Sequence, residues 1–260
     1  TPHSYFYCRA FSPTTRIMAV RDDDDRAAIN NNPLSQKGLP SPLLLGSASF
    51  TRKLILSEMN IPYHKLVRPI DEKSLGDREN DKPHDLVLTL ALAKMDHLIG
   101  EIRGGSCVDD MPNNCGASDG EWIVLTGDQV VTHDGNVLEK PESIDEAKQF
   151  VQGYGKSPCS TVGSCVLHHL PSNIQVSGVD TATIHFKPSI NGELVDRMLE
   201  EDAPILSCAG GLMIEHPLVR EHVDRIDGTE DSVMGLSKEL VVRLLDELKE
   251  KLDEHAARVK

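Results

Sequence analysis

Apolar runs and amphipathic segments alternate along the chain from residue 42 to its end. Short apolar or alternating runs predict strands, which we place at 43–45, 122–125, 160–169, 179–186, 205–209 and 219–226. Apolar positions at helical spacing predict helices at 50–59, 85–100, 192–201 and from 237 onward. Because helices and strands interleave, the pattern predicts the α/β class.

Two local signals refine this pattern. Asp134-Gly135 lies between apolar pairs at 130–131 and 137–138, which predicts a β-hairpin with an Asp-Gly turn. Ser143, followed three residues later by Glu146, fits a capping box. The sequence therefore predicts a further helix that begins directly after Ser143.

Residues 1–41 differ from the rest of the chain. They show no periodicity and contain a run of four aspartates at 22–25. We therefore expect a disordered extension, followed by a folded domain over residues 42–252. Arg9 and Arg16 stand among Ser and Thr as in a transit peptide, whereas the acidic run argues against a long transit segment. Plastid or mitochondrial targeting thus stays open beside a cytoplasmic location. The Gly- and Asn-rich residues 103–121 predict a flexible surface insertion.

Charge and cysteine content narrow the function classes. The formal net charge of −14 argues against general affinity for nucleic acid or anionic membranes. No apolar run approaches the roughly 20 residues that a membrane-spanning helix needs. The six cysteines include no C-x-x-C pair, which argues against a zinc ribbon or a thioredoxin-like site. We expect reduced thiols in a reducing compartment.

The segment at 43–56 carries the first candidate chemistry. A buried strand that runs through Gly-Ser-Ala-Ser into a helix leaves free N–H groups at the helix start, where an anion is favoured. The hydroxyls of Ser47 and Ser49 add donors, and Ser49 could also cap the helix. Arg52 and Lys53 lie in the first turn, where cations oppose the helix dipole unless an anion is bound. The alternative is a capped helix with two surface basic residues.

Further candidates follow along the chain. Lys94 shares a predicted helix face with apolar residues, which is costly unless it is paired, reaches a ligand or extends to solvent at the edge of that face. Asp128 follows a predicted buried strand and a Gly, a position that suits a metal ligand, a general base or an ordinary turn residue. Glu72 and Lys140 gain meaning only if they face the same pocket.

Taken in order, these segments resemble the Maf family of nucleotide pyrophosphatases. The matching motifs are G-S-x-S-x-x-R at 46–52, I-D-E at 70–72, L-A-x-x-K at 90–94, G-D-Q-V at 127–130, x-K-P at 139–141, C-A-G at 208–210 and G-x-x-D-S-V-x-G-L at 228–236. The resemblance covers roughly residues 42–250. It implies an α/β fold, a Maf-type two-lobed mixed sheet with flanking helices around a deep cleft, in a protein that forms a homodimer.

The resemblance also implies an activity. Maf proteins cleave a nucleoside triphosphate between its α and β phosphates, giving a nucleoside monophosphate and pyrophosphate, and they require a divalent metal cation such as Mg²⁺ or Mn²⁺. The implied substrate-binding residues are Ser47, Ser49 and Arg52, the metal ligands Glu72 and Asp128, and the cations that neutralise phosphate charge Lys94 and Lys140. Asp128 would also be the proton acceptor that activates water.

Substrate preference divides the family. Asp128-Gln129, the C-A-G segment and Glu215 resemble the branch that acts on 7-methyl-GTP, and Thr51, Gln129 and Glu215 are the implied specificity residues. A carboxylate suits 7-methylguanine, whose ring is cationic and offers two N–H donors. Phe50 and Thr51 depart from the family pattern, so dTTP, UTP, CTP and modified pyrimidine nucleotides stay open.

Two other function classes remain. A nucleotidyl- or phosphotransferase could use the same phosphate-binding segment, although the sequence offers no second substrate site. A non-catalytic nucleotide-binding protein would not need all of Glu72, Lys94, Asp128 and Lys140. Metal-dependent release of pyrophosphate separates these classes.

Overall fold

One mixed, eight-stranded sheet organises the protein. The computed structural model describes residues 32–78, 80–111 and 120–259. Its two longest strands, β6 (Cys159–Leu170) and β7 (Ile174–Phe186), form an antiparallel pair. Along the other edge of β6, β3 (Trp122–Thr126) and β4 (Gln129–His133) lie end to end. The predicted α/β class and mixed sheet are confirmed.

The remaining strands extend this sheet outward. β1 (Leu43–Leu45) lies parallel to both of its neighbours, β2 (Tyr63–Lys65) and β3. β5 (Asn136–Leu138) forms the predicted hairpin with β4, with Asp134 and Gly135 at positive φ in the turn. β8 (Val223–Asp227) pairs with β7.

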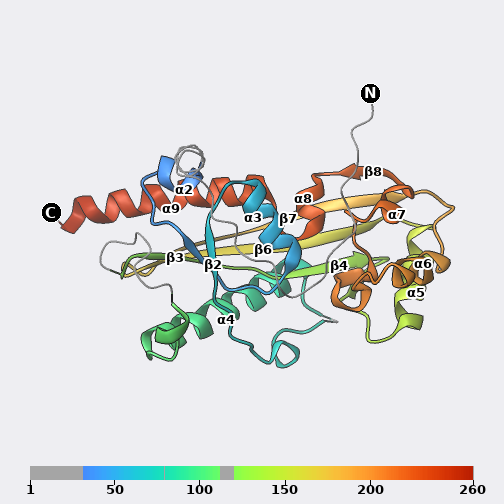
Figure 1. Cartoon of the computed structure of the whole chain (residues 1–260), viewed down its shortest axis with the longest axis horizontal. Helices are drawn as coiled ribbons and strands as arrows, with labels where there is room; N and C mark the ends of the chain where they lie inside the picture. The colour runs from blue at the N-terminus through green and yellow to red at the C-terminus, as the bar shows by residue number, and fades with distance from the viewer. Residues whose placement is uncertain (1–31, 79, 112–119, 260) are drawn as a thin grey trace.

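Helices cover both faces of the sheet. They are α2 (Pro33–Gln36), α3 (Phe50–Glu58), α4 (Pro83–Arg103), α5 (Ile144–Tyr154), α6 (Glu193–Glu200), α7 (Pro217–Arg220), α8 (Glu230–Met234) and α9 (Lys238–Val259). Short 3₁₀ turns are η1 (Glu72–Ser74), η2 (Val108–Asp110), η4 (Ile205–Ser207) and η5 (Ala209–Gly211). Figure 1 shows α3 and α9 on one face of the sheet, α4 on the other, and α5, α6 and α7 at the end near β4. No described helix has the length and apolar character of a membrane span.

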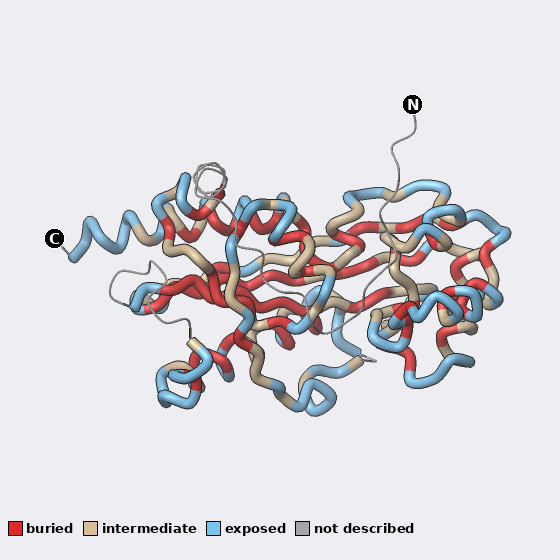
Figure 2. The backbone as a smooth tube through the Cα atoms, viewed as in Figure 1, coloured by how far each residue is buried: buried red, intermediate tan, exposed pale blue. Residues whose placement is uncertain are grey.

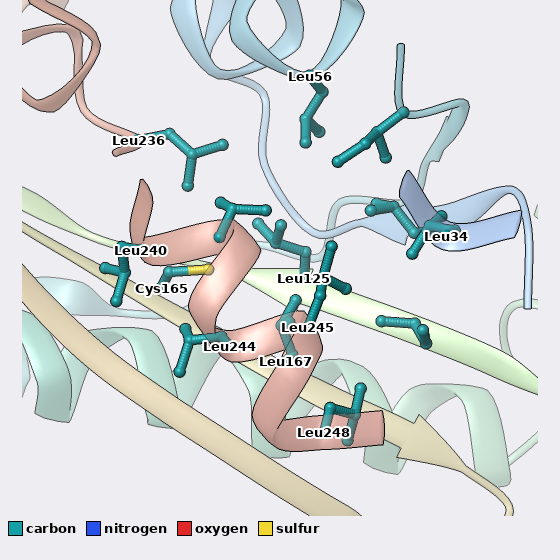
Figure 3. Close-up of a cluster of buried hydrophobic side chains, with 14 of the residues drawn as sticks. Leu34, Leu56, Leu125, Cys165, Leu167, Leu236, Leu240, Leu244, Leu245 and Leu248 are labelled. Atoms are coloured by element: carbon teal, nitrogen blue, oxygen red, sulfur yellow. The ribbon is translucent and has the colours of Figure 1, made fainter. Parts of the chain in front are cut away.

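Separate apolar clusters hold these layers together. Leu240, Leu244, Leu245 and Leu248 form one stripe of α9, at helical spacing, and pack with sheet residues such as Leu125 (Figure 3). Another cluster lies between the sheet and α4 and includes Met95 and Leu98. A further one joins α5, α6, α7 and the adjoining strands. β1, β3 and most of β6 are buried, whereas the far end of α9 is exposed (Figure 2).

The structure corrects two predicted strands. Instead of a strand at 205–209, the chain forms 3₁₀ turns at 205–207 and 209–211, and in the second turn Gly210 and Gly211 have φ near +70°. This left-handed conformation is incompatible with an extended strand and favours glycine. The strand predicted at 219–226 begins only at Val223, because Pro217–Arg220 are helical.

Folded structure also begins earlier than the expected residue 42. Asn32 caps α2, whose Leu34 is fully buried in the core beneath α9. Residues 1–31, which make up most of the expected extension, lie outside the described residues. Within the expected surface insertion, Cys107 is buried against the core under α4, and residues 112–119 lie outside the described part.

The predicted helix starts are confirmed in atomic detail. The hydroxyl of Ser49 accepts a hydrogen bond from the backbone N–H of Arg52 and caps α3. The hydroxyl of Ser143 accepts a hydrogen bond from the N–H of Glu146, and α5 begins at Ile144, directly after Ser143. The Glu146 carboxylate accepts from the N–H of Glu142 rather than from that of Ser143, one residue away from the expected capping box.

Candidate active site

Asp128 lies in the break between β3 and β4. At this break the N–H of Ser164 on β6 donates to the backbone oxygen of Asp128 (2.9 Å). The N–H of Asp128 donates in turn to the hydroxyl of Ser164 (3.1 Å), which itself donates to the backbone oxygen of Val87 on α4 (2.8 Å). Asp128 is 7% exposed. Its backbone is therefore held by the sheet at the point where the two collinear strands meet.

Gly127 permits this close approach. A Cβ at Gly127 would lie 2.4 Å from the backbone oxygen of Ser164. A larger residue would have to push Asp128 away from β6. The Gly in the G-D-Q-V motif is therefore explained by packing against Ser164.

Lys94 of α4 joins two carboxylates. Its Nζ lies 2.6 Å from Oδ1 of Asp128 and 3.1 Å from Oε1 of Glu72. The Lys94 side chain is only 17% exposed, and the other residues on its face of α4 are apolar. The structure thus resolves the alternatives left by the sequence, because this lysine is paired.

Arg52 is buried directly beside this pair. Its Nη1 donates to the backbone oxygen of Gly127 (2.9 Å) and to the hydroxyl of Ser47 (3.2 Å), and its Nε donates to the backbone oxygen of Gly235 (3.0 Å). Burial lowers the pKa of Arg52, while the charges of Asp128 and other anionic groups raise it. Arg52 therefore connects α3 to the segments that carry Gly127 and Gly235. These protein acceptors account for a cation in the first turn of α3 even when no anionic ligand is bound.

The hydroxyls before and within α3 have internal roles. The Ser47 hydroxyl accepts from Arg52 and from the N–H of Ser49 (3.2 Å). Among the described residues, no acceptor is recorded for the O–H of Ser47, which leaves one donor for a ligand. The hydroxyls of Ser49 and Thr51 are hydrogen-bonded to each other (2.9 Å). The neighbouring Phe50 is 58% exposed.

Glu72 is positioned by an arginine that the sequence analysis did not single out. Nη2 of Arg78 donates to the backbone oxygen of Glu72 (2.9 Å), and its guanidinium lies 3.3 Å from the carboxylate of Glu139, next to Lys140. The backbone oxygen of Glu139 accepts from the N–H of Gly210 (3.0 Å). Arg78 thus connects the Glu72 turn to the segments that carry Lys140 and Glu215.

Lys140 and Glu215 both act electrostatically on Cys208. Burial raises the pKa of Cys208 to about 11, with a further increase from Glu215 and a decrease from Lys140. Burial also raises the pKa of Glu215, while a hydrogen bond from its own backbone N–H opposes this; Glu230 raises the pKa further and Arg220 lowers it. Oε1 of Glu215 is buried and has no hydrogen-bond partner in the described part of the chain. A buried acceptor without a partner is costly, and a ligand with an N–H donor would satisfy it.

Gln129 contacts a different element. Its Nε2 donates to the backbone oxygen of Val233 in α8 (2.8 Å), and a Cβ at Gly235 would lie 2.1 Å from its Oε1. Gly235 has a φ of +103°. Gln129 therefore packs against the end of α8, and the amide is already engaged within the protein.

The expected residues thus fall into three sets. Ser47, Arg52, Glu72, Lys94 and Asp128 form one contiguous network. Lys140 and Glu215 both influence Cys208 electrostatically, and the side chains of Ser49, Thr51 and Gln129 form hydrogen bonds within the protein. Ser164 and Arg78 could not be recognised from the sequence, because their partners are distant along the chain.

The arrangement fits a divalent cation that is held together with a phosphate. Glu72 and Asp128 converge on one cationic group, and carboxylate oxygens suit Mg²⁺ and Mn²⁺. No group of three or more His, Cys, Asp or Glu side chains with metal-binding geometry occurs in the described ranges. Mg²⁺ commonly uses one or two carboxylates with water and substrate phosphates, so two protein ligands are sufficient.

Comparison with known proteins places this geometry in a family. The family model described as Maf-like protein matches residues 42–248. The chain belongs to the Maf family. The match spans most of the chain and includes the network around Asp128 as well as Lys140 and Glu215.

Curated relatives cover the same part of the chain. A 7-methyl-GTP pyrophosphatase of Dictyostelium discoideum is 30% identical over 207 residues, which are 80% of this chain and 97% of the relative. A dTTP/UTP pyrophosphatase of Salinibacter ruber is 28% identical, over 82% of this chain and 93% of the relative. A 7-methyl-GTP pyrophosphatase of Pseudomonas aeruginosa is 28% identical, over 80% and 95%.

Proposed function

We propose that this Maf protein hydrolyses nucleoside triphosphates between the α and β phosphates, releasing a nucleoside monophosphate and pyrophosphate. The observation that carries the proposal is the convergence of Glu72, Lys94 and Asp128, with buried Arg52 beside them. Phosphoryl transfer needs charge neutralisation and a positioned nucleophile more than it needs a special side chain. The relatives named above act on nucleoside triphosphates and support the proposal.

Each residue of the network has a role in this reaction. Asp128 accepts the proton of the attacking water, and its fixed backbone holds the acceptor in place. Lys94 and Lys140 stabilise negative charge on the phosphates, and the O–H of Ser47 donates to a phosphate oxygen. Arg52 orients Ser47 and Gly127 through its hydrogen bonds to both residues. Glu72 and Asp128 would hold a divalent cation, which when bound supplies further charge neutralisation and lowers the pKa of water.

The proposed base is 7-methylguanine. Glu215 supports this choice, because its buried oxygen lacks a partner and a carboxylate complements a cationic ring with two N–H donors. A neutral pyrimidine does not offer that charge. The alternative is the same reaction on dTTP, UTP or CTP, which the similarity to a dTTP/UTP pyrophosphatase supports. The homodimer and the location expected from the sequence stay predictions.

Product analysis tests the reaction. The purified protein is incubated with 7-methyl-GTP, GTP, UTP, dTTP and CTP in Mg²⁺ or Mn²⁺, and the products are separated by anion exchange. We expect monophosphate and pyrophosphate, with 7-methyl-GTP turned over fastest. Diphosphate and orthophosphate would contradict the assigned cleavage site. No turnover of any nucleotide would contradict the enzyme assignment, and a ranking led by UTP or dTTP would contradict the role given to Glu215.

A further inference from the structure

The ammonium of Lys94 occupies the place where two carboxylates meet. It lies within 3.1 Å of both Glu72 and Asp128; the side chains of Lys94 and Asp128 are 17% and 10% exposed, and that of Glu72 is 46% exposed. The electrostatic influence of both carboxylates also reaches buried Arg52. Two cations and two carboxylates thus balance each other without any ligand.

This balance disfavours a metal ion on its own. A divalent cation between Glu72 and Asp128 would need their oxygens at about 2.0–2.6 Å and would therefore compete with Lys94 for the same oxygens. Displacing the ammonium without a new anion would leave the partly buried cluster with excess positive charge, and charge in such a place is poorly screened. The negative charges of a triphosphate would restore the balance.

We infer that Lys94 is the internal counter-ion of the free protein and that the metal enters together with the nucleotide. On entry the ammonium moves from the carboxylates to a phosphate, a movement that its flexible four-carbon stem allows. The substrate is accordingly the metal–nucleotide complex, and the free protein has low affinity for the metal alone. This inference rests on the proposed function, because it uses the same two carboxylates and the same triphosphate.

Mn²⁺ binding, followed by electron paramagnetic resonance of the free ion, tests the inference without turnover. The proteins are wild type, Lys94→Met, Lys94→Gln and Lys148→Met, with and without a non-hydrolysable α,β-methylene nucleoside triphosphate. Lys148→Met is the matched control, since it breaks another lysine–carboxylate pair (Lys148–Asp196, 2.7 Å) away from this cluster. Lys94→Gln is included in case Lys94→Met destabilises the fold, because the amide of Gln keeps a neutral hydrogen-bond donor between the carboxylates. Thermal unfolding is measured for each variant.

We expect wild type and Lys148→Met to bind Mn²⁺ weakly until the nucleotide analogue is added. Lys94→Met and Lys94→Gln should bind Mn²⁺ about tenfold or more tightly without nucleotide, because a competing charge is gone. Adding Asp128→Asn to Lys94→Gln should remove this gain. Mn²⁺ affinity unchanged or weaker in both Lys94 variants would overturn the inference, as would tight binding by nucleotide-free wild type. Failure to hydrolyse nucleotides would instead contradict only the proposed function.

Discussion

Ser164 and Asp128 exchange two hydrogen bonds across the break between β3 and β4. The N–H of Ser164 donates to the backbone oxygen of Asp128 (2.9 Å), and the N–H of Asp128 donates to the hydroxyl of Ser164 (3.1 Å). The same hydroxyl donates to α4, the helix that carries Lys94. One buried serine therefore sets the position of the proposed proton acceptor relative to its lysine partner.

Ser164→Ala should lower both stability and turnover. The change leaves the buried N–H of Asp128 without its acceptor, which costs roughly 1–3 kcal/mol of unfolding free energy. We expect kcat to fall more than KM rises, because the acceptor is misplaced rather than lost. Ser160→Ala is the control on the same strand, since its hydroxyl bonds only to Thr183 in the recorded contacts. Equal kcat values for Ser164→Ala and Ser160→Ala would contradict this role.

Gly127→Ala should impair catalysis through packing alone. The new Cβ would lie 2.4 Å from the backbone oxygen of Ser164, so the backbone of Asp128 must shift. A displacement of about 1 Å at a reacting group can cost about 100-fold in rate, and we expect a loss of kcat/KM of that order. Gly163→Ala is the matched control, because the nearest atom to its Cβ is the Asp128 oxygen at 4.0 Å. A Gly127→Ala enzyme as active as Gly163→Ala would refute the packing argument.

Arg78→Gln should weaken metal activation. It removes the contact with the backbone oxygen of Glu72 and the pair with Glu139. Partners that orient a ligand typically contribute 10–100-fold, and we expect the Mn²⁺ concentration for half-maximal activity to rise about tenfold, with partial rescue in Arg78→Lys. Lys73→Gln breaks a highly exposed pair between the same two segments and should change little. Indistinguishable Mn²⁺ dependence in Arg78→Gln and Lys73→Gln would rule out this role.

The preference for a cationic base should depend on pH. Burial raises the pKa of Glu215, so its carboxyl keeps its proton to a higher pH than an ordinary glutamate. Only the ionised form attracts 7-methylguanine by charge. The ratio of kcat/KM for 7-methyl-GTP to that for GTP should therefore rise as pH increases through this raised pKa. A ratio that stays flat in wild type, or that changes equally in Glu215→Gln, would exclude this charge effect.

The same shift predicts the sign of a stability effect. A carboxyl whose pKa is raised by folding binds its proton more tightly in the folded protein. Its contribution to stability is present below the pKa of the unfolded chain and is lost as pH rises through the folded value. Glu215→Gln should therefore remove part of the loss of unfolding free energy between acidic and neutral pH, which thermal unfolding at a series of pH values measures.

Local features of this fold could be predicted from the sequence. The cap at Ser49, the start of α5 after Ser143 and the Asp134-Gly135 turn depend on neighbouring residues, and all are confirmed. The predicted strand at 205–209 was wrong because its apolar composition does not reveal the left-handed glycines that follow. Local sequence patterns predict helix starts and turns. They do not predict backbone conformations that depend on packing between distant segments.

The site divides in the same way. Lys94 on an apolar helix face indicated a lysine that is paired, reaches a ligand or extends to solvent, and only the fold shows that it pairs with Asp128 and Glu72. Arg52 has acceptors 75 and 183 residues away along the chain. Such contacts arise only when the strands assemble. From the sequence, an Arg52 that binds phosphate could not be distinguished from an Arg52 that positions neighbouring protein segments.

The central claim is that Asp128 activates water for pyrophosphate release. The most direct test is kcat/KM for pyrophosphate release from 7-methyl-GTP by wild type and Asp128→Asn, with thermal unfolding of both proteins. Asn keeps the shape of Asp128 but cannot accept the proton, and we expect a loss of about 100- to 10,000-fold with little change in melting temperature. An Asp128→Asn protein that is folded and retains activity close to that of wild type would contradict the account.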